Sequence, residues 1–288
     1  ILILFLSKMK KNIKFKDISF IIVSYRSDSI INSCLNALPE ESPKIIIENS
    51  YNKNLKLKLE NNYSNLNCIL SKKNLGYGAA NNIGVKKSNT KYIFIINPDV
   101  IINKQSQEDI LKIINEEDFD LAAPISSEYN NTHNFNNKSF LSVNEVKGFA
   151  MIMKKKYFEN YLFDSNIFLY LEEIDLCRRI KNNNGKIILI NTLVEHSGGN
   201  SHGNRDDLEM EKSRNWHWMW SQFYFHKKHD GYLSAFIRTL PNFVNCLFKL
   251  LFFKIFQKKE KYTKYKMRLL GLFNSYINNK SFYRPYQN

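Results

Sequence analysis

The chain has 288 residues, of which 43% are hydrophobic and 24% are charged, so it is globular rather than disordered and large enough for one domain with a small appendage. Its 42 lysines and arginines against 27 acids give a formal charge of +15, which favours anionic partners such as nucleotides, nucleic acid or acidic lipid. Residues 241–288 hold ten of these basic residues and one acid, so this segment alone supplies +9.

Residues 1–17 are expected to form an N-terminal extension. Their apolar start, residues 1–6, is much shorter than the ~20 residues that a bilayer span needs, and lysines follow it, the reverse of a signal peptide. The four cysteines are scattered with no C-x-x-C pair, so neither a zinc ribbon nor a disulfide framework is indicated. We therefore expect a cytoplasmic protein that is not exported. Whether residues 1–6 precede the natural start or add an edge strand stays open.

Apolar runs rich in β-formers alternate with helical patterns from residue 18 onward. The predicted strands are 18–24, 44–48, 67–70, 92–96 and 119–123, and the predicted helices are 29–38, 54–63, 78–88 and 105–115. This alternation predicts a mostly parallel sheet with helices on both faces, which binds ligands beyond the carboxyl ends of its strands. The residues at or just past those ends are Ser24, Glu48, Asn74 and Asp99. We expect them to converge at one edge of the sheet.

A loop with several glycines, residues 74–84, follows the third predicted strand and opens a helix. Its small residues allow a ligand to approach the backbone, and a helix start suits phosphate. The glycines lack the G-x-G-x-x-G spacing and the chain has no P-loop, which disfavours a dinucleotide dehydrogenase and a kinase. An ordinary glycine turn before a helix is the alternative.

Asn97-Pro98-Asp99 directly follows the apolar run 92–96. A buried strand that ends in an acidic residue is a place to hold a metal ion. We predict that Asp99 is a ligand of a divalent ion bound to a sugar nucleotide.

Three carboxylates, Glu172, Glu173 and Asp175, crowd the first turn of a predicted helix that ends at Gly185. A structural role is a strong alternative here, because acids complement a helix N-terminus and Asp175 with Arg179 forms an ordinary i,i+4 pair. The flanking apolar residues, however, would draw this turn toward a core. Carboxylates at the edge of an apolar wall are candidates for a general base.

A predicted strand at 186–190 precedes a predicted loop at 191–201 that contains His196 and could fold over a ligand. A lone loop histidine is more often incidental than functional. Beside an acidic ligand, however, a neutral imidazole is a reasonable partner for an ion such as Mn or Mg.

Residues 205–288 are aromatic and basic and are expected to form a helical appendage. The apolar stretch 243–256 is expected to be too short and too charged to span a bilayer. Aromatic residues next to lysines suit a helix that lies in the headgroup region, so we expect peripheral attachment to an anionic membrane surface at the inner face. Packing of these aromatics on the catalytic domain or on a second subunit is the alternative.

The order of these elements resembles glycosyltransferase family 2, the inverting GT-A enzymes, and in particular its rhamnosyltransferase-like branch from bacterial surface-polysaccharide synthesis. The resemblance covers residues 18–202. The segments that carry it are 21–25, 47–50, 74–84, 96–100, 148–151, 163–178, and His196 with Gly199 and Ser201. It implies an α/β GT-A nucleotide-diphospho-sugar transferase fold over residues 18–204.

The resemblance also implies roles for individual residues. Glu48, where the family usually has Asp, would contact the nucleobase. The other residues placed along the nucleotide sugar are Ser24, Tyr25, Asn74, Gly76, Asn82 and Asn97. Asn97-Pro98-Asp99 looks like the family's D-x-D element with only its last acid, which implies Asp99 and His196 as ligands of Mn or Mg.

The reaction implied by the resemblance is a single displacement that inverts the anomeric carbon. Glu173 stands where the family's general base is usually Asp, and Asp175 is a second candidate. The implied enzyme is a hexosyl- or rhamnosyltransferase that uses a nucleotide-diphosphate sugar and a glycan or lipid-linked acceptor. Residues 123–148 and the C-terminal region would select the acceptor.

Two other classes stay open. A sugar nucleotidyltransferase would share the nucleotide fold, but residues 25–29 lack the glycine-rich loop expected after its first strand. A nucleic-acid-binding protein would explain the charge, although no recognition motif is present and we expect no nucleic-acid partner. An inactive relative with altered motif residues is a further alternative, and homo-oligomer formation is left open.

Overall fold

The structure is a computed structural model that describes residues 11–126, 134–158, 161–197 and 207–286. The chain divides into two compact units. The sheet unit comprises Ile1–Asn74, Ala80–Phe163 and Leu176–Gly203, and the helical unit comprises Leu75–Ala79, Asp164–Asp175 and Asn204–Asn288. The expected boundary near residue 204 is therefore only part of the division, because two short earlier segments join the C-terminal helices.

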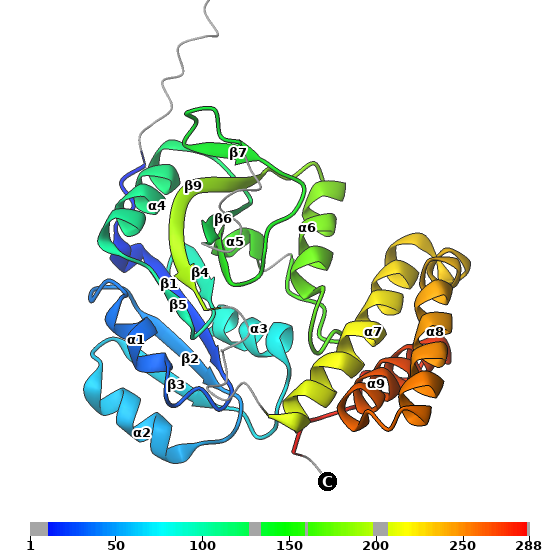
Figure 1. The fold of residues 1–288 in the computed structure, drawn as a ribbon. Helices are drawn as coiled ribbons and strands as arrows, with labels where there is room; N and C mark the ends of the chain where they lie inside the picture. Colours follow the sequence, from blue (N-terminus) through cyan, green and yellow to red (C-terminus); the bar gives the residue numbers. More distant parts are fainter. Residues whose placement is uncertain (1–10, 127–133, 159–160, 198–206, 287–288) are drawn as a thin grey trace, which may run out of the picture. The chain divides into compact units, whose positions relative to one another are not determined.

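A nine-stranded sheet forms the centre of the sheet unit in the described part of the chain. Its order is β3-β2-β1-β4-β8-β6-β9-β5, and β7 also pairs with β9 (Figure 1). The strands are β1 (Ile18–Ser24), β2 (Lys44–Glu48), β3 (Leu66–Leu70), β4 (Tyr92–Ile96), β5 (Val100–Ile101), β6 (Leu121–Ser126), β7 (Phe140–Ser142), β8 (Ala150–Lys154) and β9 (Ile187–His196).

The predicted strands are confirmed, and β1, β2 and β4 have the predicted bounds. The first four strands in the chain form a parallel block, in which Ser24 lies in register with Glu48. The sequence did not reveal β8, which runs antiparallel to both β4 and β6. Its first four residues are all buried, so it lacks the alternation that identifies a half-buried strand.

Helices follow the strands as expected: α1 (Ile31–Asn36), α2 (Lys53–Asn62), α3 (Tyr77–Lys87) and α4 (Lys104–Glu116). Asn52 and Asn103 cap α2 and α4 by accepting hydrogen bonds from backbone N–H groups in the first turn. Because β2 and β4 are buried at every position, both faces of this part of the sheet are covered. The short 3-10 helix η1 (Phe15–Asp17) and α5 (Lys155–Phe158) complete this unit.

The predicted loop after the last strand is wrong up to residue 196, because β9 continues to His196. Thr192 and Val194 are buried while their neighbours are exposed, which is the alternation of a strand, and this part pairs with β6 across a bulge and with β5. Gly199 and Ser201 lie outside the described residues.

Three long helices form most of the helical unit: α7 (Leu208–Asp230), α8 (Tyr232–Ile255) and α9 (Lys259–Tyr276) (Figure 1). Their shared core includes Met219, Phe223, Leu272 and Tyr276. The expectation about residues 243–256 is wrong in its bounds, because the helix begins at Tyr232. With 24 residues, α8 is long and apolar enough to cross a membrane, by length and composition only.

We predict that Gly271→Ala destabilises the helical unit. Gly271 lies against the backbone of α7, and a Cβ added there would be 2.1 Å from the carbonyl oxygen of Trp216. Glycine to alanine normally stabilises a helix by about 1 kcal/mol, but here the overpacking should cost about 1–3 kcal/mol. Calorimetric unfolding measures the difference, with the exposed Lys266→Ala on the same helix as the control. A Gly271→Ala protein as stable as the parent would contradict the close approach of α7 and α9.

Candidate functional site

Asp99 and His196 are adjacent in the sheet unit. Asp99 lies in the turn from β4 to β5, and Val100 pairs with His196 in the antiparallel ladder of β5 and β9. This pairing puts Asp99 Oδ1 3.7 Å from His196 Nε2. Both side chains are largely buried, with exposed fractions of 2% and 12%. The ladder therefore brings together the two residues that the sequence analysis named as metal ligands.

Hydrogen bonds and a ring contact fix this turn. The Asn97 N–H donates to the carbonyl of Phe149 over 2.9 Å, and the Phe149 ring stacks on the His196 ring with centroids 4.8 Å apart. Behind the turn, the Cys34 thiol contacts the carbonyl oxygen of Asn97 at 3.7 Å. Burial and the nearby charge of Asp99 raise the pKa of Cys34, so this cysteine stays a neutral thiol.

The donor atoms at this position fit a divalent ion that is shared with a ligand. A carboxylate oxygen and an imidazole nitrogen 3.7 Å apart are close enough to bind one ion. The residues that the structure describes contain no group of three or more His, Cys, Asp or Glu side chains that could hold a metal by themselves. An Mg²⁺-like ion, however, commonly takes one or two protein ligands and completes its shell with phosphate oxygens and water.

The loops after β2 and β3 are tied together at the same edge of the sheet. Glu48 is fully buried, and its carboxylate accepts hydrogen bonds from the Ser50 N–H and hydroxyl and from the Asn52 N–H. The Asn49 side chain donates to Asn74 Oδ1 over 2.9 Å. The predicted convergence of Ser24, Glu48 and Asn74 is thus visible in the strand register and in these contacts.

Three other residues of the predicted nucleotide pocket have contacts that the sequence did not indicate. Asn82 makes two 2.9 Å hydrogen bonds to the backbone N–H and carbonyl of Phe163. Gly76 has a φ of +82°, and a Cβ there would be 2.3 Å from the carbonyl oxygen of Phe168. The backbone N–H of the half-buried Tyr25 donates a hydrogen bond of 3.2 Å to the Ser27 hydroxyl oxygen. Asn82 and Gly76 therefore position backbone segments.

In the helical unit, a strained turn presents the glutamates at the start of α6 (Glu172–Asn182). Tyr170 and Leu171 directly precede this helix with φ values of +71° and +68°. Residues other than glycine rarely adopt this conformation, which costs on the order of 1–3 kcal/mol each and is concentrated at functional sites. The direction in which Glu172 and Glu173 leave the backbone is thus imposed by their surroundings.

Helix α7 supplies much of that constraint. The Ser221 hydroxyl donates to the carbonyl of Leu169 over 2.8 Å. Asp175 is fully buried, and its Oδ1 lies 2.6 Å from Lys228 Nζ and 2.8 Å from His229 Nε2. The sequence pattern offers Arg179 as an i,i+4 partner of Asp175, whereas Lys228 and His229 lie far along the chain. The charge of Asp175 is therefore bound in a buried ion pair.

Glu172 and Glu173 have different environments. Glu172 is buried, and its Oε2 has no hydrogen-bond partner among the described residues, whereas Glu173 is half-buried. Burial raises the pKa of Glu172 well above its usual value, and the neighbouring charge of Glu173 raises it further. The Glu172 carboxyl therefore keeps its proton to a higher pH than a carboxyl in water does.

Comparison with known proteins identifies the family. Residues 19–179, more than half of the chain, match the family described as glycosyl transferase family 2. The chain belongs to glycosyltransferase family 2.

The relatives of this family 2 member agree with that assignment. The low-salt glycan biosynthesis hexosyltransferase Agl10 of Haloferax volcanii is 25% identical over 195 residues, which cover 58% of this chain and 62% of Agl10. The chain thus matches less than two thirds of that relative. The crystal structure of S. aureus TarS 1-349 has a TM-score of 0.51 at 14% identity and covers 93% of both chains. The structure of GalNAc-T7 with UDP, GalNAc and Mn²⁺ has a TM-score of 0.53 at 11% identity, over 74% of this chain and 50% of that one. These structures confirm the GT-A-like α/β fold.

We predict that Glu172→Gln removes a pH-dependent loss of stability from this family 2 protein. Burial raises the pKa of Glu172 in the folded state, so the folded protein keeps this proton to a higher pH than the unfolded chain does. The free energy of unfolding therefore falls as the pH rises from the unfolded pKa toward the folded one. The variant should therefore gain stability over the parent at neutral pH and lose this advantage near pH 4. Urea unfolding at several pH values measures this. The exposed Glu108→Gln serves as the control and should show no such trend.

Proposed function

We propose that this chain transfers a sugar from a nucleotide-diphosphate donor to a hydroxyl group of an acceptor. The observation that carries the proposal is the Asp99–His196 pair, held 3.7 Å apart at the end of β4 in a family 2 protein. Two comparisons support it: a relative named as a hexosyltransferase, and a similar fold in a structure solved with UDP, GalNAc and Mn²⁺.

On the donor side, the nucleotide lies along the carboxyl ends of the parallel strands. Ser24, Tyr25, Asn74 and Asn97 line this edge, and Glu48 shapes the loop that receives the base through its bonds to Ser50 and Asn52. Asn82 and Gly76 act indirectly, by positioning backbone. Asp99 and His196 would hold Mn or Mg, and the bound ion would neutralise charge on the diphosphate.

On the acceptor side, Glu173 is the general base. It takes the proton from the acceptor hydroxyl as that oxygen bonds to the anomeric carbon and the bond from this carbon to the diphosphate oxygen breaks. A single displacement of this kind inverts the configuration at the anomeric carbon. Asp175 is a positioning residue, because Lys228 and His229 already bind its carboxylate.

We predict that substitutions of these acids separate turnover, binding and stability. Glu173→Gln should lower turnover by about 10²- to 10⁴-fold and leave UDP affinity unchanged, because it removes only the base. Asp99→Asn should weaken UDP binding in the presence of Mn²⁺. Asp175→Asn should lower thermal stability, because it breaks a buried ion pair.

Calorimetric titration with UDP and Mn²⁺, donor-turnover assays and thermal unfolding provide the three measurements. Exposed Glu108→Gln is the matched control for Glu173→Gln. Full turnover in Glu173→Gln would remove this residue as the base, and unchanged UDP affinity in Asp99→Asn would remove the metal site.

For the acceptor, we propose a glycan or lipid-linked glycan of surface-polysaccharide synthesis at the cytoplasmic face of a membrane. The support comes from α8, of which only three side chains are buried. Its outer side carries an exposed apolar row, the α8 stripe, at the spacing of one helix face. The α8 stripe consists of Leu233, Ile237, Leu240, Val244, Leu247, Phe248, Leu251 and Ile255.

The charge beside the α8 stripe favours an anionic bilayer as its partner. Residues 249–268 contain eight Lys or Arg side chains and a single acid, Glu260. A second copy of the chain would bring the same positive charge to this surface, whereas the anionic lipids of a cytoplasmic leaflet attract it. Because Ala235, Thr239 and Cys246 of α8 are buried within the helical unit, we propose that α8 lies in the plane of the interface.

We predict that Phe248→Glu with Ile255→Glu abolishes membrane binding. These side chains are 69% and 76% exposed, so the change should not disturb the core. The parent protein should float with vesicles that contain anionic phosphatidylglycerol at low salt and be released in part as salt increases. The matched control is Leu57→Glu on α2, which is 59% exposed and should float like the parent. A parent protein that stays in the soluble fraction, or dimerises through this surface in ultracentrifugation, would contradict the proposal.

A further inference from the structure

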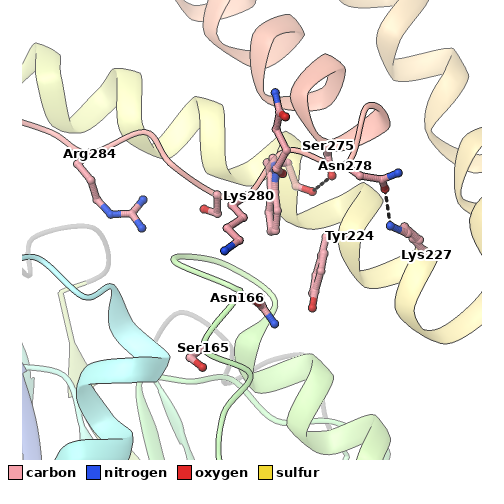
Figure 2. Close-up of a pocket in the computed structure, with 11 residues that line it drawn as sticks. Ser165, Asn166, Tyr224, Lys227, Ser275, Asn278, Lys280 and Arg284 are labelled. Atoms are coloured by element: carbon pink, nitrogen blue, oxygen red, sulfur yellow. Dashed lines mark hydrogen bonds between the residues drawn. The ribbon is translucent and has the colours of Figure 1, made fainter.

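A polar pocket of about 350 Å³ lies within the helical unit (Figure 2). Three parts of the chain form it: the segment that follows Asp164, one face of α7, and the end of α9 with the residues after it. Its lining residues are Ser165, Asn166, Trp220, Tyr224, Lys227, Ser275, Asn278, Asn279, Lys280, Ser281 and Arg284. This volume is near the lower end of the range of about 300–1,000 Å³ that is usual for small-molecule sites.

The pocket carries three positive charges and no negative one. Lys227, Lys280 and Arg284 line it, and no acid among the described residues does. Lys227 donates a hydrogen bond to the neutral side-chain oxygen of Asn278, which Figure 2 marks with a dashed line. Lys280 makes no hydrogen bond or ion pair with any described residue, and its side chain is exposed. The field inside the pocket therefore favours an anion.

The nearest acid of the segment, Asp164, already has partners outside the three cations of the pocket. Asp164 Oδ2 lies 2.8 Å from Lys228 Nζ and accepts a hydrogen bond of 2.9 Å from the Tyr224 hydroxyl. Its cationic partner is thus Lys228, the residue next to Lys227, which Asp164 shares with Asp175. Among the described residues, no acid forms an ion pair with the three cations of the pocket.

Arg284 is the most constrained of these cations. Its guanidinium lies 3.8 Å from the centroid of the Phe168 ring, and its Nη1 donates to the carbonyl of Tyr283. Partial burial lowers the pKa of Arg284, which reflects the cost of desolvating a charge. An anion in the pocket would offset that cost.

The rest of the wall suits a sugar. Hydroxyl and amide groups of Ser165, Asn166 and Asn279 can exchange hydrogen bonds with sugar hydroxyls. The Tyr224 ring adds an apolar surface and is held by stacking on Trp220, with centroids 4.9 Å apart. Trp220 in turn donates a hydrogen bond of 3.0 Å to the carbonyl of Asn279. The wall is therefore rigid and mixes polar with aromatic surface.

We infer that this pocket binds the anionic group, a phosphate or a carboxylate, of a glycan. The further step, that this glycan is the acceptor, rests on the proposed transferase function. It is supported by the chain itself, because the segment Asp164–Asp175 supplies both Ser165 and Asn166 to the pocket and the proposed base Glu173 to α6.

Calorimetric titration of the full chain tests the site without depending on turnover. The probes are glucose 1-phosphate, glucuronic acid, inorganic phosphate and neutral glucose. We expect glucose 1-phosphate, glucuronic acid or both to bind at least tenfold more tightly than glucose, and the stronger of the two identifies the source of the charge. Inorganic phosphate alone should bind more weakly than glucose 1-phosphate if the wall contributes.

Variants locate the binding. Lys280→Gln should weaken the anionic sugar about tenfold or more, because it removes a charged hydrogen-bond donor, and should leave UDP affinity with Mn²⁺ unchanged. Exposed Lys86→Gln on α3 is the matched control. Binding of the anionic sugar should survive Asp99→Asn, which excludes the donor site as its location.

Equal binding of glucose and the anionic sugars, or an unchanged affinity in Lys280→Gln, would overturn the inference. If UDP and Mn²⁺ still bind in that case, the transferase proposal is unaffected. If the anionic sugars bind as expected but the parent protein does not bind UDP, the inference about the pocket is supported and the transferase proposal fails.

Discussion

The helical unit depends on the buried ion pair between Asp175 and α7. Lys228 and His229 both approach one oxygen of this carboxylate, and Lys228 also reaches Asp164 at the other end of the same short segment. A buried charge is tolerated only with well-placed partners, so the spacing of these groups is constrained strongly. Helix α6 begins between Asp164 and Asp175, and both of these residues bind Lys228 of α7. The placement of Glu172 and Glu173 therefore depends on a helix that follows them by more than thirty residues.

The same constraint explains why the strained turn persists. Tyr170 and Leu171 would leave the left-handed region if they were free, but the Ser221 hydroxyl holds the carbonyl of Leu169 on one side and the ion pair holds Asp175 on the other. The contacts with α7 thus stabilise a backbone conformation at Tyr170 and Leu171 that these residues would not adopt by local preference. The pKa of Glu172, raised by burial, is a second sign that this turn is optimised for something other than stability.

Much of the sheet unit could be predicted from local pattern alone. Strands β1, β2 and β4 are uninterrupted apolar runs, and the residues that follow them lie at the expected edge because parallel strands in register align their ends. Asp99 and His196 were identified from motif order, yet their proximity depends on the β5–β9 ladder, where the sequence predicted a loop. The helical unit was less predictable, because contacts such as Asp175 with Lys228 join residues that no periodicity relates. The cations of the pocket were visible only as part of a basic tail, since Lys227, Lys280 and Arg284 come together through tertiary packing.

The interleaving of the two units along the chain has a practical consequence for exchanging parts between relatives. A hybrid made by joining two homologues near residue 204 would combine the C-terminal helices of one parent with the turn residues 164–175 of the other. Complementary pairs such as Ser221 with Leu169, or Lys228 with Asp175, would then come from sequences that never evolved together. Evolution of new specificity in such proteins should therefore proceed by inheriting residues 75–79, 164–175 and 204–288 as a single block.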